Sequence, residues 1–300
     1  MTGSNKNKAA AKAAPGTNGE KRPGDLSDAL ARAPSAAKQV ARPTLVDLVQ
    51  GGRVHIFLDA NVLIPEYLRT VFLDMAEAGL FQPYWSPGVL EETRRNLIDS
   101  DVYGLEVAKV DQLLKCLNKG FPSASVQGSE KYEAAFESKT DSKDQHVAAG
   151  ALKVSQSVHE GLPVLLVTHN AVDLPQWAFE GSPVLRVRPD TLLSEVARTW
   201  PSETSSALQT MLRRLKRPKL TKTDLLDYMV GSGCPVFADE LAKLWGYDLV
   251  DELTPARQEQ LPKSMKPPAP KKKVAASKAV RTAKPKKPKK PKQAKPPKVK

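Results

Sequence analysis

Short apolar runs alternate with segments of helical spacing through the middle of the chain. Four runs are typical of short buried strands: VHIFLD (54–59), FQPYW (81–85), GLPVLLVT (161–168) and SPVLRV (182–187). The segments between them predict helices over 61–80, 86–98, 103–118, around 130–137 and 143–158. This alternation predicts an α/β fold, in which a parallel sheet is flanked by helices on both faces.

The pattern changes after Pro189, where strand-like runs stop. Four amphipathic segments with Pro or Gly at their ends predict consecutive helices: TLLSEVARTW, ETSSALQTMLRRLK, TKTDLLDYMVGSG and PVFADELAKLWGY. We therefore expect an α/β domain over 43–189 and a small all-helical C-terminal segment over 190–252.

The two ends of the chain lack a sustained apolar period. Residues 1–42 are rich in Ala, Lys, Gly and Pro, and residues 253–300 are rich in Lys and Pro, which predicts disordered tails. From Pro262 to Lys300 there are 16 Lys and Arg residues and no acid, so the net charge of +13 comes from the C-terminal tail. A Pro-spaced cationic segment can follow a phosphate backbone, and we expect this tail to bind nucleic acid or the ribosome.

Composition also narrows the compartment. No apolar stretch is long enough to span a membrane, and the N-terminus does not resemble a secretory signal. Cys116 and Cys234 stand alone, without the spacing of a metal site. We expect a cytoplasmic protein with two buried thiols and no membrane partner.

Four segments carry acidic or amide side chains at or near strand ends: Asp59; Glu91 and Glu92; Asp141 and Asp144; Asn170 and Asp173. The carboxyl ends of parallel strands meet at one edge of a sheet, so these groups are predicted to converge. Crowded carboxylates repel one another, and hard cations such as Mg²⁺ or Mn²⁺ offset that repulsion. A bound cation can also activate water and hold phosphate oxygens.

Four motifs carry a resemblance to a known family: FLDANVLIP (57–65), SPGVLEETRRNL (86–97), DSKDQHVAAGAL (141–152) and VTHNAVDLP (167–175). In this order they resemble PIN-domain ribonucleases of the VapC type, the toxins of toxin–antitoxin pairs. The resemblance covers about 53–190. The segment RPKLTKTDLLDYMVGSGCPVFADEL resembles the helical C-terminal extension of one PIN subgroup.

The resemblance implies a role for each matched residue. Asp59, Glu92 and Asp144 match the metal-binding acids, with Glu91 as the neighbouring alternative to Glu92. Asn61 matches the polar residue that braces the first acid.

The last motif departs from the family pattern. The commonest PIN form has an aspartate where this chain has Asn170. An amide can orient water or phosphate but carries no charge, and Asp173 is the candidate to supply the missing acid. Asp141 is expected at the rim of the site. Two consequences of the departure stay open: weaker metal affinity, or a second ion that binds only with substrate.

Each residue also has a purely structural interpretation. Asp59 could cap the following helix, and Glu91 suits a first helical turn. Asn170 and Asp173 could be turn residues before a proline. Four further side chains are expected to pack rather than to serve catalysis or base stacking: His146, His169, Trp177 and Trp200.

The resulting prediction is a metal-dependent endoribonuclease that hydrolyses single-stranded RNA with a metal-activated water. By resemblance, its products carry a 5′-phosphate and a 3′-hydroxyl, a cognate antitoxin inhibits it, and it pairs as a homodimer. The alternative is a catalytically weak or inactive PIN-like protein that binds nucleic acid through its basic tail. A phosphatase with an aspartyl nucleophile is disfavoured, because Asn61 stands where its second aspartate belongs.

Overall fold

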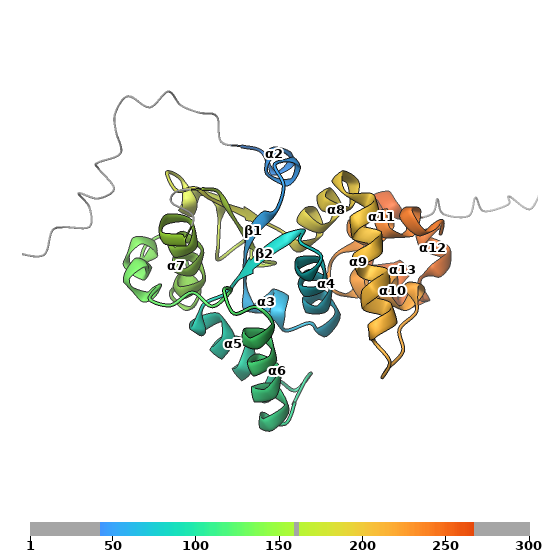
Figure 1. Ribbon diagram of the computed structural model, residues 1–300, viewed down its shortest axis with the longest axis horizontal. Helices are drawn as coiled ribbons and strands as arrows, with labels where there is room; N and C mark the ends of the chain where they lie inside the picture. The colour runs from blue at the N-terminus through green and yellow to red at the C-terminus, as the bar shows by residue number, and fades with distance from the viewer. Residues whose placement is uncertain (1–42, 159–161, 267–300) are drawn as a thin grey trace, which may run out of the picture.

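A four-stranded parallel sheet lies at the centre of the computed structural model, which describes residues 43–158 and 162–266 (Figure 1). The strands are β1 (Val54–Leu58), β2 (Phe81–Tyr84), β3 (Val164–Val167) and β4 (Val184–Val187). Their order across the sheet is β2-β1-β3-β4, and every neighbouring pair is parallel. The predicted α/β fold with a parallel sheet is confirmed.

The α/β part of the chain has seven further helical elements that bear on the fold: α2 (Leu45–Gln50), α3 (Ala60–Leu63), α4 (Glu66–Glu77), α5 (Pro87–Asp99), α6 (Val107–Gly120), the 3₁₀ helix η1 (Glu130–Phe136) and α7 (Gln145–Lys153). Three short helical turns complete it: η2 (Ser142–Asp144), η3 (Val154–Val158) and η4 (Gln176–Phe179).

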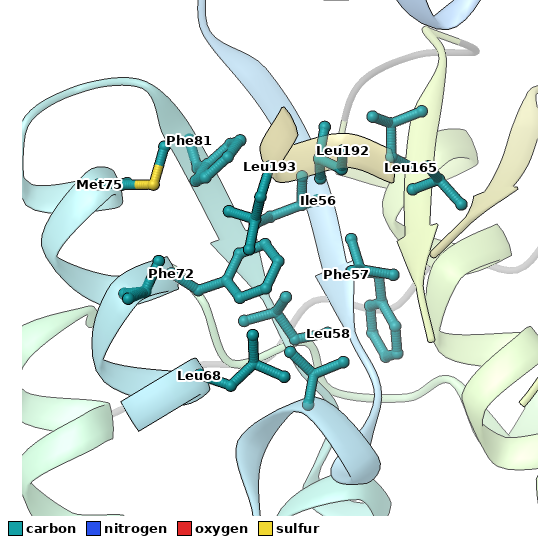
Figure 2. Packing of buried hydrophobic residues seen from close by; sticks show 14 of the residues in the cluster. Ile56, Phe57, Leu58, Leu68, Phe72, Met75, Phe81, Leu165, Leu192 and Leu193 are labelled. Carbon is teal, nitrogen blue, oxygen red and sulfur yellow. The ribbon is translucent and has the colours of Figure 1, made fainter. Parts of the chain in front are cut away.

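Alternate residues of β1 pack into different helical layers. Figure 2 shows Ile56 and Leu58 pointing toward Phe72 of α4, whereas Phe57 points the other way. The Phe57 ring lies against Gly150 of α7. The side chains of Ile56, Phe57, Leu58 and Phe72 are aromatic or aliphatic and fully buried, so the strand is held by apolar contacts on both faces.

The predicted helix over 61–80 is interrupted, and in this respect the prediction was wrong. α3 ends at Leu63 and α4 starts at Glu66, because Pro65 has no N–H to donate and adopts an extended conformation. The buried Arg69 side chain donates to the carbonyl oxygens of Leu63 and Ile64, which lack helical partners. Pro65 therefore causes the break between α3 and α4, and Arg69 stabilises it.

Other predicted helices differ at their ends. The helix expected over 103–118 spans Val107–Gly120, because Gly104 forms a turn at φ +49°. The segment around 130–137 is a 3₁₀ helix, not an α-helix. The helix expected over 143–158 has an α-helical centre, α7, that continues as the π-helical turn η3.

The four predicted C-terminal helices are present as α8 (Pro189–Thr199), α9 (Pro201–Arg214), α10 (Lys222–Gly231) and α11 (Pro235–Trp245). The boundary predicted at 252 lies too early. Beyond α12 (Leu249–Glu252), α13 (Pro255–Gln260) and the turn η5 (Lys263–Met265) continue the segment. Leu253 and Leu261 are buried, and these two isolated apolar residues are too sparse to produce a helical period.

The helical segment packs directly onto the α/β part. Leu192 and Leu193 of α8 lie beside the strands in Figure 2. Arg214 of α9 pairs with Asp74 at 2.5 Å and with Glu77 at 3.1 Å, both in or at the end of α4. These contacts make the two parts share one hydrophobic core.

The cysteine prediction holds for one residue only. Cys234 is buried, where desolvation raises the pKa of its thiol, but Cys116 is exposed. No helix among residues 43–158 and 162–266 combines the length and apolarity needed to cross a membrane. The predicted tail over 1–42, and residues 267–300 of the basic tail, lie outside the described residues.

Replacing Gly150 tests the packing of α7 on the sheet. A Cβ at this position would lie 2.2 Å from Cζ of the buried Phe57 ring. Gly150→Ala should therefore lower the free energy of unfolding by about 1–3 kcal/mol, measured by urea denaturation. Gly120→Ala is the matched control, since nothing lies within 4 Å of its Cβ position. Equal stability of the two variants would contradict this packing.

Candidate active site

Neighbouring strands bring two segments of the candidate site together. β1 and β3 pair in parallel with Leu58 opposite Val167, and the Asp59 N–H donates to the Val167 carbonyl at 3.2 Å. Asp59 and Thr168 therefore leave the sheet side by side, although 109 positions separate them in the sequence. The strand pairing alone places the first acid beside the third strand's end.

The Asp59 carboxylate is buried, accepts hydrogen bonds from two side chains and does not cap a helix. Its Oδ2 accepts from Thr168 Oγ1 and from Asn61 Nδ2, both at 2.6 Å. The Asp59 side chain makes no capping hydrogen bond to α3, so the structural interpretation of this residue does not hold. Asn61 also accepts from the His169 N–H at 3.1 Å, which ties the two strand ends together.

Asn170 joins two further acids. Its Nδ2 donates to Asp144 Oδ2 at 3.3 Å and to Asp173 Oδ2 at 3.0 Å, while its Oδ1 accepts from the Asp173 N–H. Asp144 lies at the start of α7 without capping it, and Lys143 Nζ lies 3.9 Å from Asp173. The amide therefore separates two carboxylates that would otherwise face one another.

Glu92 enters the site from α5. The N-terminus of this helix is set by Ser86, whose hydroxyl accepts from the Val89 N–H. Glu92 Oε2 lies 3.2 Å from His146 Nε2, and neither atom has a well-aligned hydrogen-bond partner among the described residues. Glu91 is exposed, consistent with a solvated position on the helix.

His146 has a more defined environment than its sequence indicated. Its ring packs where a Cβ of Gly88 would be, at 2.9 Å from Cδ2, so a glycine on α5 makes room for it. Burial lowers the pKa of His146, but contact with Glu92 outweighs burial and leaves this pKa raised. Because Glu92 lies on α5 and His146 on α7, their contact leaves no local signal in the sequence.

The other residues named in the sequence lie at the edge of the candidate site or outside it. Asp141 caps η2 by accepting from the Lys143 N–H at 3.1 Å. His169 packs against Gly233, and burial with the charge of Arg188 lowers its pKa. Trp200 is partly buried against the core, but Trp177 is 55 % exposed, so the packing role predicted for Trp177 was wrong.

The acids influence one another electrostatically. Desolvation raises the pKa of Asp59 to about 6, and the charges of Glu92 and Asp144 add to this effect against the Thr168 hydrogen bond. Desolvation also raises the pKa of Asp144, supported by Asp173 and Glu92 and opposed by Lys143. Asp59, Glu92 and Asp144 thus share one electrostatic environment.

This environment fits a divalent cation in its chemistry. No group of three or more His, Cys, Asp or Glu side chains in the described part of the chain is arranged to hold an ion as it stands. The donors are nevertheless hard carboxylate oxygens, and buried Glu92 Oε2 has only a histidine facing it. Repulsion among neighbouring carboxylates is the kind that a divalent cation would offset.

The fold and these residues define an α/β protein with an acidic site at the carboxyl edge of a parallel sheet. Residues 189–243, from α8 into α11, match the family model of the VapC50 C-terminal domain. This match suggests a VapC-family protein related to toxin–antitoxin systems, and it covers the helical segment rather than the sheet. Comparison with curated proteins and with solved structures gives no match.

The raised pKa of Asp59 predicts a specific pH dependence. Between about pH 4 and pH 6 the unfolded chain loses this proton while the folded protein keeps it, so the free energy of unfolding falls as pH rises. At pH 7 this carboxyl lowers the free energy of unfolding by about 3 kcal/mol, and Asp59→Asn should remove that destabilisation. Urea denaturation in EDTA at pH 4 and pH 7 measures the difference. Parallel pH profiles for the two proteins would contradict the burial of an ionisable acid here.

Proposed function

We propose that the protein is a metal-dependent endoribonuclease of the VapC type that hydrolyses single-stranded RNA. The observation that carries this proposal is the convergence of Asp59, Glu92 and Asp144 at one sheet edge, from three separate elements. Structural acids are normally paired with cations or act as helix caps, whereas the charges of Glu92 and Asp144 both disfavour the charged form of the buried Asp59. A site of this kind is expected where a cation is to be bound.

Each residue has a defined part in the proposed site. Asp59, Glu92 and Asp144 would hold Mg²⁺ or Mn²⁺, and Asn170 with Asp173 would complete the polar shell. When bound there, such a cation supplies Lewis acidity toward water and the phosphate oxygens. Thr168 and Asn61 orient the Asp59 carboxylate, because both donate to its Oδ2.

The partners follow from the helical segment and from charge. The match of residues 189–243 supports a toxin with a cognate antitoxin, and PIN-type domains commonly form homodimers. The cationic residues from Pro262 to Lys300 would add affinity for RNA or the ribosome without sequence specificity.

Cleavage of labelled single-stranded RNA with Mn²⁺ or Mg²⁺ tests the proposal. Asp59→Asn, Glu92→Gln and Asp144→Asn should each lower the cleavage rate by more than about 100-fold, because each removes a charged ligand. Glu91→Gln is the matched control and should cut like the parent, since Glu91 is exposed beside Glu92. EDTA should abolish cutting.

Two results would contradict the proposal. Cutting by Asp59→Asn at the parent rate would show that the candidate site does not take part in RNA cleavage. Binding without cutting, equal in all variants and lost on removal of residues 262–300, would favour the alternative of a nucleic-acid-binding protein that acts through its tail.

Asn170→Asp tests how the amide balances the site. The change replaces a donor to Asp144 and Asp173 with a third acceptor, so the metal-free protein should lose about 1–3 kcal/mol of unfolding free energy. Saturating Mn²⁺ should restore more stability to this variant than to the parent, because the added charge strengthens binding. Thermal melts with and without Mn²⁺ measure both effects. Equal stabilisation of both proteins by Mn²⁺ would place Asn170 outside the metal shell.

A further inference from the structure

We propose that a pocket beside the acids holds a nucleobase of the RNA, stacked on Trp177. This inference rests on the proposed function, since it names a subsite for that substrate. The pocket has a volume of about 390 Å³ and is open to solvent. Its lining includes Lys139, Thr140, Asp141, Asp173 and Trp177.

The indole is presented on a firmly anchored turn. Trp177 lies on η4 and is 55 % exposed, while the next two residues, Ala178 and Phe179, are buried. Phe179 packs on Phe136 with ring centroids 5.5 Å apart, and Gln176 Oε1 accepts from the Arg186 N–H at 2.9 Å. The Phe136 contact and the Arg186 hydrogen bond therefore hold the turn in place, and the exposed indole of Trp177 lies on this anchored turn.

Other lining residues supply polar groups. They come from the turn between η1 and η2, where Lys139 is exposed and Thr140 is partly buried. Asp141 carries an acceptor that can meet an amino group of a base, and Lys143 adds a second exposed cation near the pocket's Asp173. An aromatic face, short polar side chains and nearby cations match one nucleotide, with its ring, its polar edge and its phosphates.

The pocket is linked to the candidate metal ligands by one hydrogen-bonded residue. Asp173 lines the pocket and accepts from Asn170, which also donates to Asp144. A base on Trp177 would therefore place its own phosphate toward the acids. The mobility of single-stranded RNA allows this splayed arrangement, whereas a duplex keeps its bases stacked inside the helix.

Binding is measured with the full chain carrying Asp59→Asn, so that turnover does not interfere. The probe is a fluorescein-labelled single-stranded RNA oligonucleotide, titrated at about 0.3 M salt to weaken the contribution of the basic tail. Trp177→Ala should weaken binding roughly tenfold, and Trp177→Phe should restore most of it, because phenylalanine keeps a stacking face. Tyr103→Ala, at another exposed aromatic residue outside the pocket, should leave the affinity unchanged.

An abasic position scanned through the oligonucleotide separates stacking from a general loss of structure. At one position the abasic change should weaken binding to the Trp177 protein, with little further effect in Trp177→Ala. In the cleaving parent, Trp177→Ala should raise KM more than it lowers kcat. Unchanged affinity in Trp177→Ala, or equal abasic effects in both proteins, would overturn the subsite.

These readouts also distinguish the two proposals. Absence of metal-dependent cutting would overturn the nuclease, while Trp177-dependent binding of the oligonucleotide would still support the pocket. Cutting that is unaffected by Trp177 would overturn the pocket and leave the nuclease in place.

Discussion

The site depends on the parallel pairing of β1 with β3. This pairing ends with Asp59 and Thr168 adjacent, and the 2.6 Å hydrogen bond between them holds the first acid where solvent cannot reach it. Asn61 closes the arrangement by bonding both residues and the His169 backbone. A slip of either strand by one residue would turn these side chains into the core on the opposite face.

Burying carboxylates together has a cost that the surrounding side chains reduce without removing it. Asn170 places an N–H₂ group between Asp144 and Asp173, and His146 faces Glu92. Desolvation by burial still raises the pKa values of Asp59 and Asp144, and neighbouring carboxylates add to it. In the described part of the chain, these histidine and amide contacts are among the polar partners that the structure gives to Glu92, Asp144 and Asp173.

Much of the site could be predicted from the sequence, because strand ends and helix starts leave local signals. Asp59 and Asn170 follow apolar runs, and Asp144 precedes α7. Glu92 lies inside α5 and Asp173 in the turn after β3, so the candidacy of these two came from the motif resemblance. His146 and Trp177 could not be assigned in this way. Their environments depend on Gly88 and Phe179, which lie on other elements or face the core, so no local pattern distinguishes them from packing residues.

The alternation of strands and helices and the segments that carry acids could be read from the chain alone, because they follow from local hydrophobic periodicity and residue type; the break at Pro65 was missed. The strand order, the depth of Asp59 and the exposure of Trp177 were decided only by the tertiary structure. The helical segment shows the same division, since its helices were predictable but its attachment through Arg214 and the α8 leucines was not. Contacts between distant segments depend on packing geometry, which periodicity along the chain does not encode.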